Sequence, residues 1–440
     1  MLRLGAPLIL SQLALMGIGV TDSIMLGWYS VEALAAGVLG HTVFFVIFIV
    51  GAGFGMAVMP LVASAIARDE TKEIRRVTRM GIWLSIAYSI AVLPLFIFSE
   101  FLLVMIRQPA ELAHSASRYL VIVGFAIIPA LIIQVLKSYL TAQELVKFAL
   151  ATSILGFIVN IPLNYVLIFG KFGVSELGVE GSAIASVLVN SFMASCLCIY
   201  ASLKLSKQAL FQRIWRPDWP SMGAVARLGL PISVTSLAET GLFSASTLMM
   251  GWLGTVAVAA HGIALSITSL TFVIHVGLSS AATIQVGQAF GAHRLDELKR
   301  SVIMASIASG LVVLGTVILF LCIPEFLVSL FVDPKVPELN QILIYGSMLL
   351  LMSALFSTVD AAQVMALGIL RGIHDTSVPM FMAVVSYWLI GIPVAYWLSF
   401  TLGWEGIGVW AGLALGLACA AFGLIIRFFI LYRKLRARAD

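Results

Sequence analysis

Residues 3–40 read RLGAPLILSQLALMGIGVTDSIMLGWYSVEALAAGVLG, and residues 227–264 read RLGLPISVTSLAETGLFSASTLMMGWLGTVAVAAHGIA. The two stretches align without a gap at an offset of 224 residues, and 13 of their 38 positions are identical. Later in the chain, Ile161-Pro162 corresponds to Ile392-Pro393. The sequence is therefore a tandem repeat, and its two halves should share one topology. Parallel repeats of this kind are typical of transporters whose site lies between or within the halves.

The composition indicates an integral membrane protein. Of the 440 residues, 61% are hydrophobic and 11% are charged, whereas a soluble globular domain has about 25% charged residues. We expect an all-α fold with about twelve transmembrane helices in two six-helix bundles related by the repeat. The first span begins almost at the amino terminus and no small-residue cleavage site precedes it, so no cleavable signal peptide is expected. The expected spans are 7–27, 37–66, 79–106, 118–142, 148–169, 181–205, 229–251, 259–290, 301–331, 339–370, 378–402 and 407–432.

These spans divide the chain into an amino-terminal lobe, residues 1–205, a cytoplasmic linker, residues 206–226, and a carboxy-terminal lobe, residues 227–440. The excess of Lys and Arg is a topology signal and does not indicate a nucleic-acid partner. The positive-inside rule places both termini in the cytoplasm. All but four of the 26 Lys and Arg residues then lie on the cytoplasmic side; the four are Arg107, Arg118, Lys171 and Lys335.

Two acids are expected near the middle of the membrane in the carboxy-terminal lobe. Asp360 precedes Arg371 by eleven residues, which places it roughly 16 Å from the cytoplasmic end of its helix. Glu239 follows Arg227 by twelve residues, which places it roughly 18 Å from the cytoplasmic end of its own helix. An acid at that depth is costly unless it is paired, protonated or facing water, so such acids usually mark ion or proton paths. The alternative is a structural acid that is hydrogen-bonded to a neighbouring helix. Phe356, one turn before Asp360, can offer its ring to a cation or can simply pack.

The amino-terminal lobe carries a second polar group. Asp22 follows Arg3 by nineteen residues, and Asn160 and Asn164 share one helix face at i and i+4. Ser186 enters the sixth span at a similar depth. These residues can form a cation or proton site. Equally, Asp22 can be a helix-end residue in contact with water, and the asparagines can hold helices together.

Other chemistry is disfavoured by the motifs. The six histidines form no HExxH pair and no GxxxxGK[ST] phosphate loop occurs, so neither a transition-metal site nor direct ATP coupling is expected. The four cysteines lie in apolar segments without metal-ligand or disulfide spacing. No histidine stands at helical spacing from Asp22, Glu239 or Asp360, which disfavours a membrane enzyme. We expect no catalytic residue and no cofactor.

The chain resembles the multidrug and toxic compound extrusion (MATE) family, and most closely its NorM branch, over nearly its whole length. The matching motifs are TDSIMLG from Thr21, NIPLNYVLIFG from Asn160, GVEGSAIAS ending at Ser186, PISVTSLAETGLF from Pro231, VGQAFGA at 286–292 and VDAAQVMALGILRGIHDT from Val359. The resemblance implies a proton or cation site at Asp22, Asn160, Asn164 and Ser186, and a cation site, with Na+ as a candidate ion, at Glu239 and Asp360.

Two positions depart from the family pattern. Asn164 stands where some members have an acid, and Phe356 stands where some have a tyrosine.

The function that the resemblance implies is antiport by alternating access, in which an amphipathic, often cationic organic compound leaves the cell as Na+ or H+ enters. The expected location is the bacterial inner membrane, the expected partners are small organic substrates and lipid, and the expected state is a monomer. The alternative is a flippase for a lipid-linked precursor, which needs a cavity lined with Arg and Lys.

Overall fold

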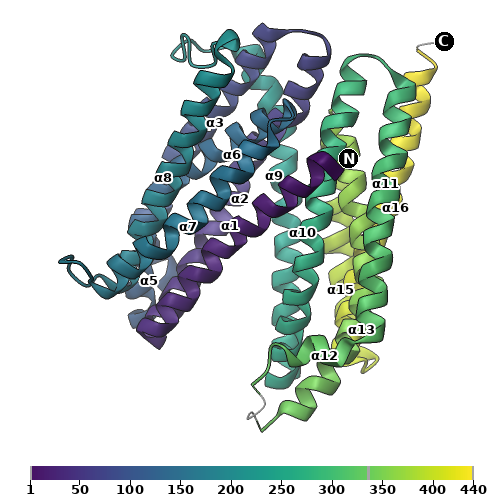
Figure 1. Ribbon diagram of the computed structural model, residues 1–440. Coiled ribbons are helices and arrows are strands. Elements are labelled where there is room, and N and C mark those ends of the chain that lie inside the picture. The colour runs from purple at the N-terminus through teal and green to yellow at the C-terminus, as the bar shows by residue number, and fades with distance from the viewer. Residues whose placement is uncertain (1, 334–336, 439–440) are drawn as a thin grey trace. The chain divides into compact units, whose positions relative to one another are not determined.

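The computed structural model describes residues 2–333 and 337–438, and within these ranges it is built from helices (Figure 1). Twelve helical segments of the described chain are long and apolar enough to cross a membrane, which confirms the predicted fold class. Lys335 lies outside the described residues. The longer elements are α1 (Leu2–Tyr29), α2 (Val31–Ala67), α3 (Thr71–Ile97), α5 (Ala110–Val123), α6 (Ile127–Ala142), α7 (Val146–Phe169), α8 (Gly178–Lys204), α9 (Trp219–Leu253), α10 (Thr255–Gly291), α11 (Leu295–Cys322), α13 (Leu339–Gly372) and α16 (Glu405–Arg436).

The backbone keeps the 224-residue offset of the sequence repeat. Ser30 separates α1 from α2, and its side chain caps α2 by accepting a hydrogen bond from the backbone N–H of Ala33 at 3.0 Å. Gly254 separates α9 from α10 at the equivalent position, with φ 124°. The turns that follow α2 and α10 contain Asp69, with φ 58°, and His293, with φ 57°, again 224 residues apart. The repeat is therefore a repeat of helix boundaries as well as of residues.

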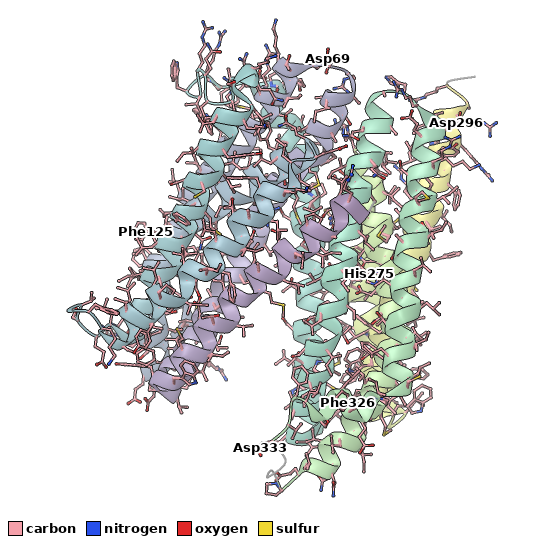
Figure 2. The ribbon with its side chains drawn as sticks, in the orientation of Figure 1. Asp69, Phe125, His275, Asp296, Phe326 and Asp333 are labelled. Atoms are coloured by element: carbon pink, nitrogen blue, oxygen red, sulfur yellow. The ribbon has the colours of Figure 1, made fainter. Side chains whose placement is uncertain are left out.

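The chain forms two compact units, Leu10–Ser233 and Met1–Ile9 with Val234–Asp440. The boundary falls inside α9, which begins at Trp219, within the range expected for the linker. Asp218 starts this helix, because its carboxylate accepts a hydrogen bond from the backbone N–H of Ser221 at 3.2 Å. Figure 2 labels Asp69 at the α2–α3 turn of the first unit, and in the second unit it labels His275 midway along α10 and Asp296 in the first turn of α11.

The segment before α9 is held against the first unit by side chains of α3. The guanidinium of Arg79 donates to the carbonyls of Gln212 and Arg213, both at 3.0 Å, and the indole of Trp83 donates to the carbonyl of Ile214 at 2.7 Å. These hydrogen bonds fix the segment before α9 to α3 within the first unit.

In the second unit, α13 is the central helix and packs against α10, α11 and α16. The eleventh span is irregular: two π-helical segments, η3 (Val385–Gly391) and η4 (Trp397–Thr401), flank the short helix α15 (Ile392–Tyr396), which begins with Pro393 in its first turn. Proline lacks the N–H that the helix ladder needs, which favours such irregular turns. The span packs on a Gly408-Gly412-Gly416 stripe of α16, and a Cβ on Gly412 would overlap the backbone of Ala395. The remaining short elements are η1 (Gly124–Ala126), η2 (Ser206–Gln208), α4 (Ser99–Met105), α12 (Pro324–Ser329) and α14 (Ser377–Val384).

Candidate functional site

The structure brings Glu239 and Asp360 together in the second unit. Asp360, on α13, is 2% exposed, and Glu239, on α9, is half-buried. Their carboxyl groups lie within electrostatic range of each other. One oxygen of each, Glu239 Oε1 and Asp360 Oδ1, is buried and has no hydrogen-bond partner within the protein. Two such oxygens are costly unless a positive charge or a proton satisfies them.

Two more side chains that can supply oxygen ligands flank Asp360 on the same helix. Ser357 and Gln363 stand three residues before and after it, roughly 60° to either side at 3.6 residues per turn. The Gln363 amide nitrogen donates to the Tyr387 hydroxyl at 2.7 Å, whereas Gln363 Oε1 and Ser357 Oγ have no hydrogen-bond partner within the protein. Oxygen ligands of this kind suit hard cations. No cluster of three or more His, Cys, Asp or Glu side chains occurs in the described residues.

Arg371 lies beside the candidate site, although its place in the sequence indicated only a helix end. Its side chain is half-buried in the last turn of α13 and lies within electrostatic range of Glu239 and of Tyr387. A signal was present in the sequence, because eleven residues are about three helical turns and place Arg371 on the same face as Asp360. No sequence spacing points to Tyr387, because the direction of its side chain depends on the π-helical turn that contains it.

An aromatic cluster encloses Phe356, which is 1% exposed. Its ring meets those of Trp410 and Phe243 edge to face, with centroids 5.3 and 6.0 Å apart. The Trp410 indole donates to Nδ1 of His261 at 3.1 Å, and Nε2 of that ring lies 3.2 Å from the Thr247 hydroxyl. Since Nδ1 must accept, this network assigns the proton of the neutral ring to Nε2. The suggested contact of Phe356 with a cation stays a prediction.

The four polar residues expected in the amino-terminal lobe lie together in the first unit. Asp22 is 8% exposed, and its Oδ1 accepts from the amide nitrogens of Asn160 at 3.0 Å and of Asn164 at 2.6 Å. Its Oδ2 accepts from the Ser186 hydroxyl at 3.3 Å. The carbonyl oxygens of both asparagines are buried without a protein partner. These three hydrogen bonds therefore stabilise an ionised or cation-bound Asp22 carboxylate, a stabilisation that an isolated buried acid would lack.

Tyr119, on α5, also belongs to this group and was not identified from the sequence. It is 3% exposed and lies beside Ser186, within electrostatic range of Asp22. The space for its ring comes from Gly40 of α2, where a Cβ would overlap the ring. Neither the tyrosine nor the glycine lies on the helix that carries Asp22, so only the packing of separate helices reveals the contact.

The acids of the two lobes occupy different positions of the repeat. The residue that corresponds to Asp22 is Ser246, and the one that corresponds to Glu239 is Leu15, both at the 224-residue offset. The backbone is thus duplicated, whereas each polar site is built from its own residues.

Comparisons with known proteins agree with this architecture. The family model described as MatE matches residues 7–166 and 231–397, one match in each half of the repeat. The probable multidrug resistance protein NorM of Agrobacterium fabrum is 43% identical over 436 residues, which are 98% of this chain and 94% of that protein. A crystal structure of a MATE protein in the bent conformation has a TM-score of 0.90 at 19% identity and covers 99% of this chain and 96% of that one.

The eukaryotic MATE transporter AtDTX14 has a TM-score of 0.85 at 22% identity over 100% of this chain and 98% of that one, which shows the same fold. The family match covers both repeats and the relative spans nearly the full length, so the predicted resemblance is confirmed. The chain is a multi-pass membrane protein that belongs to the MatE family.

Proposed function

We propose that this protein is a secondary active antiporter that exports amphipathic or cationic organic compounds in exchange for Na+ or H+. The observation that carries the proposal is the pair of Asp360, a buried acid, and Glu239, a half-buried acid, which lie within electrostatic range of each other and each keep one buried oxygen without a hydrogen-bond partner. The similarity to relatives named as probable multidrug resistance proteins supports the substrate class.

The exchange follows from competition for one site. A Na+ ion, a proton or the positive charge of a drug can each satisfy the two carboxylates, but not all at once. If ion and drug exclude each other there, ion entry from outside favours release of the drug. Alternating access then requires that ion and drug prefer different states of the two lobes, because a ligand shifts an equilibrium only by its difference in affinity.

The membrane orientation and cellular setting belong to the same proposal. The distribution of Lys and Arg supports cytoplasmic termini in a bacterial inner membrane. We propose a monomer that needs no cofactor beyond the coupling ion and catalyses no covalent step. Transport of a lipid-linked diphosphate is the second candidate from the sequence, but Arg371, a cation beside the site, already has the Glu239 carboxylate within electrostatic range.

Reconstituted vesicles test the proposal. Ethidium efflux should follow an imposed Na+ gradient or an imposed pH gradient, and the gradient that works identifies the coupling ion. Glu239→Gln and Asp360→Asn should abolish this efflux while the protein still folds, because each removes a charge and keeps the shape. Glu325→Gln, which changes an exposed acid of α12 in the same unit, is the matched control and should transport normally. Wild-type efflux in both site variants would end the assignment.

A further inference from the structure

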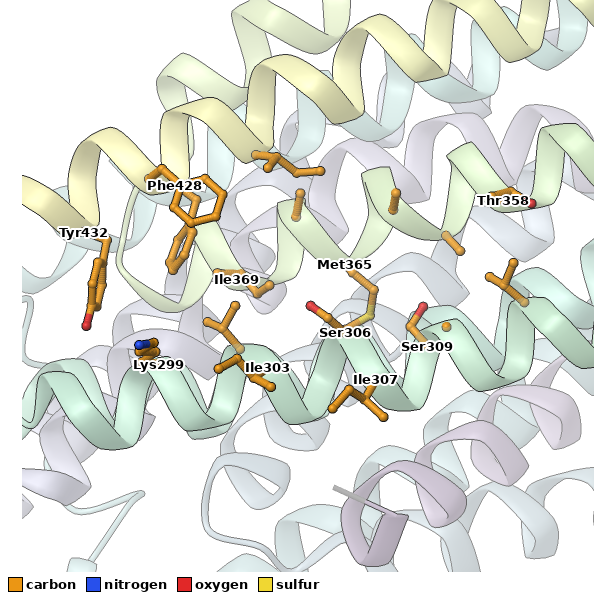
Figure 3. Close-up of a pocket in the computed structure, with 18 residues that line it drawn as sticks. Lys299, Ile303, Ser306, Ile307, Ser309, Thr358, Met365, Ile369, Phe428 and Tyr432 are labelled. Carbon is orange, nitrogen blue, oxygen red and sulfur yellow. The ribbon is translucent and has the colours of Figure 1, made fainter.

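A groove runs along α13 between α11 and α16 (Figure 3). Its volume is about 660 Å³. α13 packs against both neighbours, whereas α11 and α16 make few contacts with each other, and this leaves the groove open between them. Side chains of α13, three of them alanines beside the larger Met365 and Ile369, form its floor, and apolar side chains of α11 and α16 form its walls. They include Ala361, Ala362 and Ala366 on the floor, and Ile307, Phe428 and Phe429 on the walls.

The groove lies on the opposite side of α13 from the buried acid. At 3.6 residues per turn, Ala362 and Ile369 are rotated about 200° and 180° from Asp360. Two wall residues are strongly exposed, Ile307 at 54% and Phe429 at 56%. Because α11, α13 and α16 are all membrane-spanning segments, this exposed apolar face meets lipid.

One end of the groove carries its charged lining residue. Lys299 and Tyr432 lie together there, while Thr358 marks the other end (Figure 3). The last turn of α16 adds further positive charge beside that end, from Arg433, Lys434 and Arg436. The first turn of α11 carries the acids Asp296 and Glu297, and Glu297 is paired with Arg294 at 3.1 Å. The balance at this end is positive, which favours a negatively charged head group and disfavours a cationic drug.

The length of the groove matches one leaflet of a bilayer. Thr358 and Ile369 are eleven residues apart on α13, which is roughly 16 Å along the helix. One leaflet contributes about 15 Å of hydrocarbon. Basic pockets between transmembrane helices commonly bind anionic lipid head groups. We propose that this groove binds an acyl chain of an anionic phospholipid, whose head group is held at Lys299. A bound lipid would brace the back of the helix that carries Asp360.

Glycines of α11 provide a matched pair of variants. A Cβ on Gly310 would meet no atom within 4 Å and would enter the groove that this residue lines. A Cβ on Gly315 of the same helix also meets no atom within 4 Å, but Gly315 does not line the groove. Gly310→Phe should therefore fill the groove without disturbing the helix, and Gly315→Phe is its control. Lys299→Gln removes the head-group charge, and Lys72→Gln at the start of α3 is the control for that change.

The test uses the full-length protein in detergent with equal amounts of phosphatidylglycerol and phosphatidylcholine that carry identical acyl chains. Bound lipid is counted by native mass spectrometry. The wild-type protein and both controls should retain phosphatidylglycerol in preference. Gly310→Phe should lose bound lipid of both kinds, and Lys299→Gln should keep lipid with the preference reduced about fivefold, as expected for one basic residue near an anionic group. Retention by Gly310→Phe equal to that of Gly315→Phe, or an unchanged preference in Lys299→Gln, would overturn the proposal.

Discussion

Removal of the Asn164 amide should destabilise the first unit mainly through Asp22. The bond between them is 2.6 Å long, its acceptor is a carboxylate, and both side chains are buried. Hydrogen bonds to charged groups contribute about 1.5–3 kcal/mol, whereas hydrogen bonds between transmembrane helices average about 0.6 kcal/mol. Because the acceptor is a carboxyl group and both side chains are buried, we expect Asn164→Ala to lower the free energy of unfolding by about 1.5–3 kcal/mol.

A double-mutant cycle isolates this bond. The free energy of unfolding is measured in mixed micelles for the wild-type protein, Asn164→Ala, Asp22→Ala and the double variant, and the coupling should be at least 1.5 kcal/mol. Asn190→Ala is the control, because its amide donates to the backbone carbonyl of Ser186, a neutral acceptor, at 2.8 Å. Its cost should be about 0.5–1.5 kcal/mol. A coupling below about 0.5 kcal/mol between Asn164 and Asp22 would refute the view that the amides hold a buried charge.

Three further predictions concern the second unit. Gly412→Leu should prevent recovery of folded protein, because its side chain would overlap the backbone of α15, whereas Gly423→Leu on the same helix should be tolerated; monodispersity on size-exclusion chromatography decides between them. Trp410→Phe should cost about 1–3 kcal/mol of unfolding free energy, measured in mixed micelles, because His261 Nδ1 loses its donor, and a cost near zero would contradict the assigned network. Arg371→Met should tighten cation binding several-fold, because it removes a positive charge that acts on the Glu239 carboxylate. Weaker binding of 22Na+ or of protons would contradict this.

The sequence predicted the architecture well because membrane helices are specified locally. Runs of apolar residues and the 224-residue repeat are visible in one dimension, and the helix boundaries at Ser30 and Gly254 keep that offset. The depth of an acid also follows from counting residues to the helix end. Counting therefore predicted that Glu239 and Asp360 would share a level, and the structure places them within electrostatic range.

The remaining site residues depend on packing that counting does not describe. Tyr387, whose hydroxyl accepts from the Gln363 amide, lies inside the π-helical segment η3. Its direction therefore does not follow from counting 3.6 residues per turn. Tyr119 reaches the Asp22 group because Gly40, which is far from Tyr119 in the sequence, leaves space for the tyrosine ring. Arg371 shares a face with Asp360, but its position at the helix end made it resemble a topology signal. Long side chains can reach back along a helix, so a terminal cation need not belong to the surface.

Competition between ion and drug requires that the coupling ion be released when a drug binds. Ethidium is titrated into purified protein in weak buffer, and the released protons and Na+ are measured with a pH dye and an ion-selective electrode. We expect release of about one cation for each ethidium bound, as required when two ligands compete for one site, and no release from the Glu239→Gln/Asp360→Asn double variant. Ethidium binding without cation release, or equal release from the double variant, would show that ion and drug do not compete at Glu239 and Asp360.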